Sequence, residues 1–279
     1  MTLGELIASA TARLAAAGID SPRVDAELLA AHVMQVERSA LALRADRPVD
    51  ASHESAYAEL MSRRVAREPL QYILGRAPFR HLLLEVGPGV FIPRPETELL
   101  VDAVLPQLRA IDAPRVVDLC SGSGALALSI ANEVPAAFVL AVEADDAALP
   151  WLRRNADGTH VHVGRGDVAD ADLLADLRGS VDVVVSNPPY VPAAAIVDAE
   201  VRADPAVAVF GGADGLAVIP HVIRRAAELL RPGGQFAMEH ESSQGRVVPE
   251  LLRMDGRWTA IADHKDLAGR PRYVTATRT

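Results

Sequence analysis

The fold is decided by one stretch of the chain, Val116-Val117-Asp118-Leu119-Cys120-Ser121-Gly122-Ser123-Gly124-Ala125-Leu126-Ala127. An apolar run leads into a turn that holds two glycines, and a second apolar run follows the turn. This order predicts a buried strand, a tight loop and a helix. A unit of this kind is typical of folds in which strands and helices alternate along the chain.

The alternation continues from this stretch to the end of the chain. The predicted strands cover 115–119, 137–142, 161–164, 181–186, 235–239, 258–262 and 273–277, and the predicted helices cover 123–133, 145–155, 170–177, 217–230 and 244–253. The pattern predicts an α/β fold with a mostly parallel sheet that is covered on both faces. Ligands bind beyond the carboxyl ends of such strands, so the loops after the strands are the candidate site.

The residues before the sheet predict two smaller parts. Residues 1–75 read as a helical bundle, with a helix that stops at Gly18, a second helix that begins at Pro22 and a third over about 50–66 that Pro69 ends. Residues 76–93 read as a β-hairpin linker, with strands at 82–86 and 90–92 around a glycine-proline turn. The catalytic domain is then 94–279.

Composition limits the classes of function. The 279 residues are 50% hydrophobic, enough for one large core and a smaller one. The net charge is −9; residues 1–80 hold ten arginines and ten acids, which leaves 18 basic and 27 acidic residues for 81–279. An acidic catalytic half argues against stable nucleic-acid binding.

Cysteine usage and the N-terminus indicate the compartment. Cys120 is the only cysteine, so neither a disulfide framework nor a cysteine-based zinc site is expected. Glu5 stands where a signal peptide would need basic residues, and no apolar stretch approaches the ~20 residues that cross a bilayer. We expect a cytoplasmic protein with no membrane segment and no metal.

Acids that follow three successive strands suggest a cofactor site. Gly122 and Gly124 let the backbone approach a ligand closely, and Asp118 can accept hydrogen bonds from a cationic group. Glu143 follows Gly124 by 19 residues, a spacing that suits ribose hydroxyls, and Asp167 could reach an adenine amino group. The alternative is that these residues are only strand-end turns of a doubly wound fold.

The loop favours S-adenosyl-L-methionine over a dinucleotide. A dinucleotide fingerprint needs G-x-G-x-x-G and a helix N-terminus that is free to hold a pyrophosphate. Here Asp118 precedes the loop, where it would repel a phosphate but attract a sulfonium and an ammonium group.

The fourth predicted strand runs into Asn187-Pro188-Pro189-Tyr190, which suggests an acceptor site for a planar NH2 group. The side-chain carbonyl of Asn187 and the main-chain carbonyl of Pro188 can each accept one N–H, and this would aim the nitrogen at an activated methyl group. Tyr190 offers a flat face to the acceptor, and two prolines hold the carbonyls in place. The alternative interpretation is a rigid strand exit.

A second unusual string is Phe91-Ile92-Pro93-Arg94-Pro95-Glu96-Thr97-Glu98. Its prolines and acids are also typical of the start of a helix. Arg94 has no such explanation, so we predict that it binds the substrate.

These strings resemble the HemK/PrmC family, the peptide-chain release factor glutamine methyltransferases. The resemblance covers essentially the whole chain. It includes the helical N-terminal domain, the stretches 67–75, 92–98 and 187–190, and Glu239-His240. It implies a class I methyltransferase fold, Rossmann-like, whose seven-stranded sheet has its last strand antiparallel. It also implies that the protein methylates N5 of the glutamine in the Gly-Gly-Gln tip of release factors and leaves S-adenosyl-L-homocysteine.

The resemblance also assigns residues. It implies cofactor contacts at Cys120, Ser121, Gly122, Ser123, Gly124, Glu143, Asp167, Val168 and Asn187, beside Asp118, and substrate contacts at Asn187, Pro188, Pro189 and Tyr190. The family has a glycine where this chain has Cys120, and we expect an ordinary backbone conformation there. Glu239 and His240 are expected to be a buried, hydrogen-bonded strand end with no assigned role.

Three other functions compete with this interpretation. A nucleic-acid N6-adenine or guanine methyltransferase would meet the same NH2 geometry but should carry a basic cleft and stacking aromatics. A ribosomal-protein glutamine methyltransferase and a cofactor-binding scaffold without activity are the others.

The N-terminal domain is the predicted docking surface for the protein substrate. Near its end stand five arginines, Arg63, Arg64, Arg67, Arg76 and Arg80. The alternative is that these arginines only form a solvated face.

Overall fold

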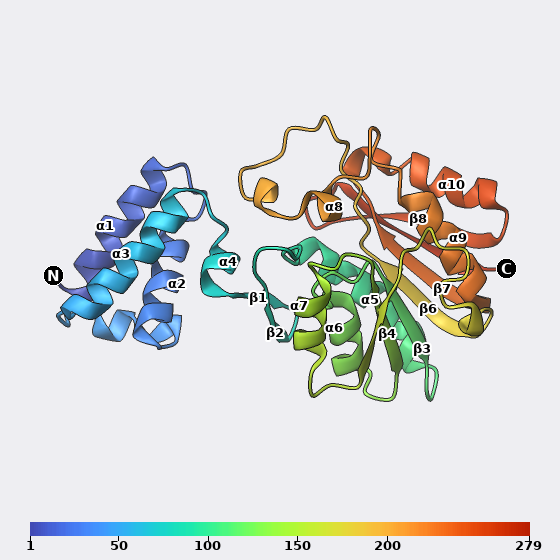
Figure 1. The fold of residues 1–279 in the computed structure, drawn as a ribbon, viewed down its shortest axis with the longest axis horizontal. Coiled ribbons are helices and arrows are strands. Elements are labelled where there is room, and N and C mark those ends of the chain that lie inside the picture. The colour runs from blue at the N-terminus through green and yellow to red at the C-terminus, as the bar shows by residue number, and fades with distance from the viewer. The chain divides into compact units, whose positions relative to one another are not determined.

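The computed structural model describes residues 1–279 and contains the predicted seven-stranded sheet (Figure 1). Its strands are β3 (Arg115–Leu119), β4 (Phe138–Glu143), β5 (Val161–Arg165), β6 (Val181–Ser186), β7 (Leu230–Glu239), β8 (Trp258–Lys265) and β9 (Pro271–Arg278). They lie in the order β5-β4-β3-β6-β7-β9-β8, and β9 runs antiparallel to both of its neighbours. The predicted fold class and the antiparallel last strand are confirmed.

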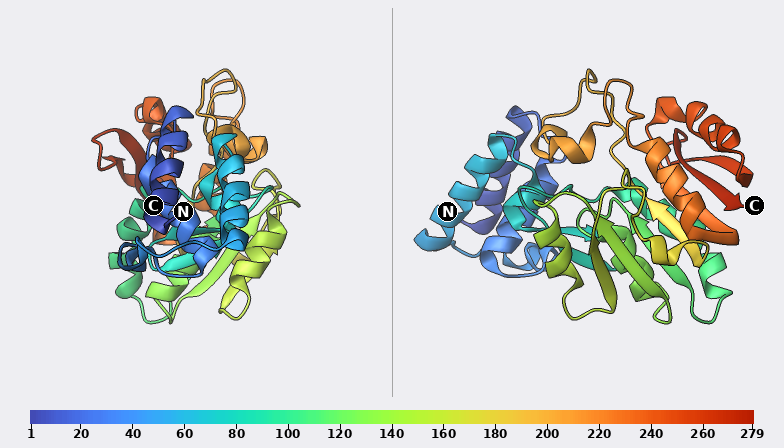
Figure 2. Two further views of the ribbon diagram at one scale, coloured as in Figure 1. Left: turned by 90° about the vertical axis from the view of Figure 1, so that its left-hand side faces the viewer. Right: turned by 45° about the vertical axis from the view of Figure 1, so that its right-hand side comes forward.

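Helices cover both faces of this sheet (Figure 2). The helices of the sheet-containing part are α5 (Glu98–Arg109), α6 (Ala125–Glu133), α7 (Leu149–Ala156), α8 (Ala206–Val209), α9 (Ile219–Leu229) and α10 (Val247–Asp255). Val116 packs in one core with α5, α6 and α7, whereas Val117 packs in the other with α9 and α10. Successive residues of a strand point to opposite faces, which explains why the buried strands β3 and β6 are mostly apolar on both faces.

The predicted helix at 170–177 is wrong, because this segment forms only the 3₁₀ turn η4 (Ala175–Leu177). Asp167 and Asp170 bind the main-chain N–H groups of Ala169 and Asp172 at 2.8 Å and 3.0 Å. Aspartates that bond to their own backbone compete with helix formation. The other 3₁₀ helices are η1 (Arg38–Ala40), η2 (Ala42–Arg44), η3 (Pro95–Thr97), η5 (Val201–Ala203) and η6 (Ser242–Gln244).

The topological switch point of the sheet lies at β3. The chain leaves β3 toward β4 and β5 on one side and then crosses to β6 and β7 on the other. The hydroxyl of Ser186, the last residue of β6, donates to the main-chain oxygen of Leu119 at the end of β3, at 2.7 Å. The loops that follow β3 and β6 therefore begin side by side, where ligands bind in open α/β sheets.

The N-terminal region is helical, as predicted, and Met1–Arg76 forms one compact unit together with Asp198–Ala203. Its helices are α1 (Leu3–Ala16), α2 (Pro22–Met34), α3 (Ala51–Val65) and α4 (Leu70–Leu74). Leu14, Leu29 and Tyr57 are among its buried core residues. The prediction for Pro69 is wrong, because α3 already ends at Val65 and Pro69 instead opens the short helix α4.

The strands of the hairpin were predicted at the wrong positions in the sequence. Its strands are β1 (Arg76–Phe79) and β2 (Leu82–Glu85), and the turn between them is Arg80-His81, with Arg80 at φ 51°. Residues 86–92 form no strand, although Val90 and Ile92 are buried. These residues are apolar because they pack in a core, and packing gives the same sequence signal as a buried strand. The hairpin belongs almost entirely to the second compact unit, Ala77–Val197 with Asp204–Thr279.

The predicted arginine surface is largely used inside the protein. Arg64 is 6% exposed and donates to Asp25 at 2.7 Å and to Glu200 at 3.0 Å. Arg67 donates to the other Glu200 oxygen at 2.6 Å, and Arg63 pairs with Glu68. Arg80 pairs with Glu133 and Asp102, so four of the five arginines have carboxylate partners, and Arg76 alone is exposed without one. Docking of a substrate by the N-terminal domain stays a prediction.

No helix in the structure has the length and apolar character that crossing a bilayer requires.

Candidate active site

The loop after β3 contains three residues with a positive φ angle. Cys120, Gly122 and Gly124 have φ values of 61°, 56° and 88°, all in the left-handed region. The expectation of an ordinary conformation at Cys120 is therefore wrong. A residue with a Cβ adopts the left-handed conformation at a cost of about 1–2 kcal/mol.

Asp118 is fully buried below this loop, and one of its carboxylate oxygens has no partner. Oδ2 accepts the main-chain N–H of Ala127 at 3.2 Å, which satisfies an amide in the first turn of α6. Oδ1 is buried without a hydrogen bond. The pKa of Asp118 is raised to about 7, chiefly by burial and to a smaller extent by the charge of Glu143, while polar contacts with Ser121 and Ala127 act in the opposite direction. An unpaired buried carboxylate is costly, so this site favours a cationic ligand.

Glu143 joins the end of β4 to the glycine loop. Its Oε2 accepts the N–H of Gly122 at 2.7 Å, and its Oε1 accepts the N–H groups of Ala144 and Asp145 at 2.8 Å each. Oε1 is thus saturated, while Oε2 can accept one more donor. The predicted contact with both ribose hydroxyls would need one of the present main-chain bonds to open.

The third acid, Asp167, lies at the same edge of the sheet. Its Oδ1 accepts the N–H of Ala169 at 2.8 Å, and Val168 beside it is buried. The pKa of the Cys120 thiol is raised, mainly by burial and then by the charges of Glu143, Asp118 and Asp167. All three carboxylates are therefore within electrostatic reach of one side chain in the glycine loop.

These residues fit the predicted cofactor. The orphaned Asp118 oxygen suits an ammonium or sulfonium group, Glu143 keeps one acceptor position for a hydroxyl, and Asp167 is exposed beside buried Val168. An ideal Cβ on Gly122 meets nothing within 4 Å, so there is open space at the turn, whereas one on Gly124 would lie 2.7 Å from Leu152 Cδ1. Ser121 and Ser123, the remaining residues of the loop, are buried.

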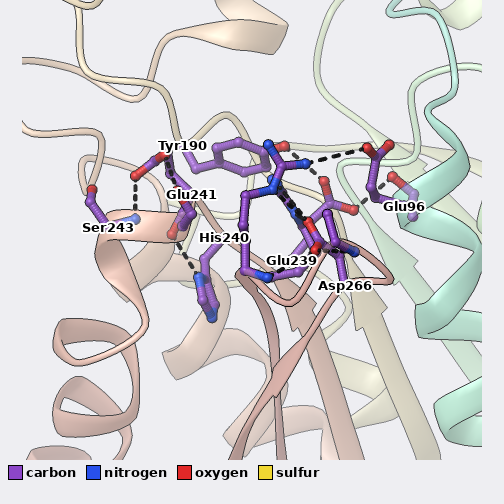
Figure 3. A network of polar contacts seen from close by, with 12 residues as sticks. Glu96, Tyr190, Glu239, His240, Glu241, Ser243 and Asp266 are labelled. Carbon is purple, nitrogen blue, oxygen red and sulfur yellow. Dashed lines mark hydrogen bonds and ion pairs between the residues drawn. The ribbon is translucent and has the colours of Figure 1, made fainter.

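The loop after β6 holds the acceptor residues in a hydrogen-bonded network. Asn187 Nδ2 donates to Thr97 Oγ1 at 3.1 Å, and the Thr97 hydroxyl donates to Glu239 Oε2 at 2.6 Å. The Tyr190 hydroxyl donates to Glu239 Oε1 at 2.7 Å, and Figure 3 shows these two side chains in one polar network. Asn187 Oδ1 and the main-chain oxygen of Pro188 accept no hydrogen bond from the protein. The two predicted carbonyl acceptors are thus available.

Glu239 is the charged centre of this network. Burial raises the pKa of Glu239, while its bonds to Thr97 and Tyr190 and the nearby charge of Arg272 act in the opposite direction. Burial also raises the pKa of Tyr190, followed by the charge of Glu239. Arg272 is itself held by Asp266 at 3.2 Å. The phenol of Tyr190 therefore stays a hydrogen-bond donor to a buried carboxylate.

Arg94 is held by the protein itself. It pairs with Asp204, whose other oxygen accepts the N–H of Ile92 at 3.1 Å, and it lies 5.0 Å from the ring centroid of Phe91. These contacts give Arg94 a structural role. Its contact with a substrate stays a prediction.

Sequence reasoning missed the residues behind the acceptor loop. An ideal Cβ on Gly211 would lie 2.5 Å from the main-chain oxygen of Pro189, and one on Gly215 would lie 2.1 Å from that of Tyr190. Gln244 Nε2 donates to the same Tyr190 oxygen at 3.0 Å. The string Gly211-Gly212 was a visible signal, but nothing in the sequence indicated which backbone it would approach.

The second residue of the Glu239-His240 pair has only structural partners. His240 is fully buried, and its ring nitrogens face the main-chain oxygen of Glu241 at 2.9 Å and Asp263 Oδ1 at 2.8 Å. Both residues form the buried, hydrogen-bonded strand end that was expected.

The site can be compared with known proteins. The family model of the PrmC N-terminal domain matches residues 5–75, and that of the methyltransferase small domain matches 88–203. The release factor glutamine methyltransferase of Mycolicibacterium smegmatis is 51% identical over 98% of this chain and 96% of that protein. The chain belongs to the release factor glutamine methyltransferase family. Its Asn187–Tyr190 loop and the cofactor loop both lie within the second matched region.

One further relative and one solved structure are also similar to this chain. A 4-amino-L-phenylalanine/4-methylamino-L-phenylalanine methyltransferase of Streptomyces pristinaespiralis is 41% identical over 92% of this chain and 89% of that protein. A 16S rRNA N2 methyltransferase of T. thermophilus, solved with AdoMet and guanosine, is 23% identical over 73% of this chain and 50% of its own, with a TM-score of 0.53. The second likeness concerns the fold alone.

Proposed function

We propose that this protein transfers a methyl group from S-adenosyl-L-methionine to N5 of the glutamine in the Gly-Gly-Gln motif of peptide-chain release factors. The observation that carries the proposal is the Asn187 amide, whose Nδ2 is bound to Thr97 and whose Oδ1 accepts nothing from the protein. Relatives that share nearly the whole chain are named release factor glutamine methyltransferases. We expect such an enzyme to work in the cytoplasm, with translation.

The residues of the acceptor loop orient the substrate amide toward the methyl group. An amide nitrogen is a weak nucleophile because its lone pair is delocalised, and S-adenosyl-L-methionine supplies an already activated methyl group. Asn187 Oδ1 and the Pro188 oxygen each accept one N–H of the substrate amide and stabilise positive charge that develops on the nitrogen. Tyr190, fixed by Glu239, presents its ring to the planar amide, and Pro189 stiffens the loop.

The cofactor would lie over the loops of the other three strands. We propose that Asp118 faces a cationic group, Glu143 a ribose hydroxyl and Asp167 with Val168 the adenine, above the turn from Cys120 to Gly124. These roles are supported by the orphaned Asp118 oxygen and by the shared charge environment of the three acids. They do not depend on a metal or a covalent intermediate.

The test is the transfer of labelled methyl to a purified release factor. We expect the wild-type release factor to be labelled and its Gln→Ala variant at the Gly-Gly-Gln motif to stay unlabelled. Asn187→Ala should lose at least about a hundredfold in kcat, because it removes one of the two acceptors that orient the nucleophile. Equal labelling of the Gln→Ala variant would refute the assigned acceptor.

A second candidate function is methylation of a free aromatic amine. It is favoured by the 41% identity with the 4-amino-L-phenylalanine/4-methylamino-L-phenylalanine methyltransferase, since an aromatic NH2 also offers two N–H donors. Offering 4-amino-L-phenylalanine in the same assay separates the two functions. Naked DNA and RNA in parallel reactions test the nucleic-acid alternative, and labelling of either would favour it.

We also propose that the N-terminal unit docks the protein substrate. Because Arg63, Arg64 and Arg67 are already paired, we expect other exposed residues of this unit, Arg76 among them, to contribute to the docking surface. Substitutions of such residues would reveal it by a raised KM for the release factor with an unchanged kcat.

A further inference from the structure

The charge of nearby Arg272 and the two hydroxyl donors favour an ionised Glu239, against the effect of burial. With Glu239 ionised, the hydrogen bonds around it run in one direction only, because an ionised carboxylate accepts and never donates. Its two oxygens receive the Thr97 hydroxyl at 2.6 Å and the Tyr190 hydroxyl at 2.7 Å, so both hydroxyl hydrogens point at Glu239. Glu239 and Thr97 are 1% and 4% exposed, which removes water as an alternative partner.

The direction at Thr97 determines the orientation of Asn187. Thr97 has a single hydroxyl hydrogen, which is used on Glu239, so its oxygen can only accept from the amide 3.1 Å away. The NH2 end of Asn187 must therefore face Thr97. If the amide turned over, two oxygens would face each other at hydrogen-bond distance without a hydrogen between them, which is unfavourable in a buried site.

We propose that Thr97 and Glu239 are positioning residues that fix the polarity of the Asn187 amide, so that the acceptor site presents an oxygen and takes only a group with an N–H. The inference rests on the proposed function and goes beyond it, because it names what selects an amide over a carboxylate. A glutamate in place of the substrate glutamine would set its oxygens against Oδ1.

The four elements involved make this arrangement rigid. Thr97 ends η3, just before α5, Asn187 follows β6 directly, and Glu239 ends β7, the strand that pairs with β6. Ser186 pairs with Met238 in that ladder, so Asn187 and Glu239 follow neighbouring positions on adjacent strands. A short threonine side chain from the start of α5 bridges them. None of these three side chains needs to move for the polarity to be set.

The test compares Thr97→Val with Thr97→Ser. Valine keeps the shape and removes the hydroxyl, so we expect kcat with a release factor to fall about ten- to a hundredfold while its KM and the Kd for S-adenosyl-L-homocysteine change less than about threefold. Serine keeps the hydroxyl and should retain kcat within about threefold. Tyr57→Phe, which loses one buried hydrogen bond in the N-terminal unit, is the control: it should lower thermal stability and leave kcat unchanged.

A second readout does not depend on the substrate. In ¹⁵N NMR spectra of the protein with S-adenosyl-L-homocysteine, the Asn187 NH2 signals, identified by their loss in Asn187→Ala, should exchange slowly with solvent hydrogen in wild type and Thr97→Ser and faster in Thr97→Val. If wild type labels no release factor but this difference is seen, the proposed function fails and the positioning role stands. If Thr97→Val keeps both kcat and slow exchange, or if Thr97→Ser is as impaired as Thr97→Val, the positioning role is wrong.

Discussion

The main-chain N–H of Gly122 donates to Glu143 Oε2 at 2.7 Å, so the loop of one strand is tied to the end of the next. The carboxylate also binds two N–H groups of its own loop through Oε1. It therefore shapes the turn and, in the proposed site, receives a ribose hydroxyl. Replacing either oxygen by an NH2 group would affect both roles, because each oxygen accepts a main-chain N–H.

Glu143→Gln should weaken binding of S-adenosyl-L-homocysteine about ten- to a hundredfold, because hydrogen bonds to a charged acceptor contribute about 1.5–3 kcal/mol. Isothermal titration calorimetry measures the change. Asp146→Asn is the matched control, since Asp146 lies three residues further on the same loop and forms only an exposed ion pair with Arg165. An unchanged Kd for Glu143→Gln would remove Glu143 from the cofactor site.

Binding of S-adenosyl-L-homocysteine should depend on pH through Asp118. The pKa of this carboxyl is raised to about 7 in the protein alone. A ligand ammonium group favours the ionised form, so affinity should be highest above pH 7 and fall by up to about tenfold per pH unit below it. Asp118→Asn should bind more weakly and show a flat profile between pH 5.5 and 8.5. A wild-type slope that survives in Asp118→Asn would assign the titration to another group.

The strained backbone at Cys120 predicts opposite effects for two substitutions. Cys120→Gly removes the Cβ from a residue in the left-handed region. The free energy of unfolding should therefore rise, or fall by less than about 1 kcal/mol, and cofactor binding should be kept. Cys120→Val places a β-branched residue at φ 61° and should lose more than about 1 kcal/mol. Urea denaturation measures both. Equal stability of the two variants would show that the turn relaxes away from this conformation.

Gly211→Ala tests the support behind the acceptor loop. A Cβ there would lie 2.5 Å from the Pro189 oxygen and 2.7 Å from that of Gly215, and backbone atoms cannot yield as a side chain can. We expect kcat to fall at least about tenfold with the Kd for S-adenosyl-L-homocysteine nearly unchanged. Gly164→Ala, whose Cβ would make ordinary contacts at 3.6 Å, is the control. A fully active Gly211→Ala would mean that the Asn187–Tyr190 loop tolerates displacement.

The central strands could be predicted because they are buried on both faces. The predicted bounds 115–119 and 181–186 are those of β3 and β6, and the loops after these strands follow at once. The strand prediction failed at Val90 and Ile92, because apolar residues that pack in a core look the same in the sequence as apolar residues of a strand. The helix prediction failed near Asp170, because this side chain binds a nearby main-chain N–H.

Sequence analysis could predict only those site residues that have polar side chains and also stand at or next to the end of a strand. Asp118 is the second-last residue of β3, Glu143 ends β4 and Asn187 directly follows β6, so topology alone brings them to one edge. Thr97 precedes Asn187 by 90 residues and reaches it through the packing of α5 on the sheet. No spacing rule connects the two, and the same holds for Gly211 behind Pro189.

The segment Asp198–Ala203 belongs to the N-terminal unit although it stands more than a hundred residues beyond that unit's last helix. Buried Arg64 has two carboxylate partners, and one of them, Glu200, comes from this segment. Cutting the polypeptide at residue 76 would leave Arg64 with Asp25 alone and Arg67 without its carboxylate partner. We therefore expect the isolated N-terminal fragment to be less stable than the same residues in the full chain.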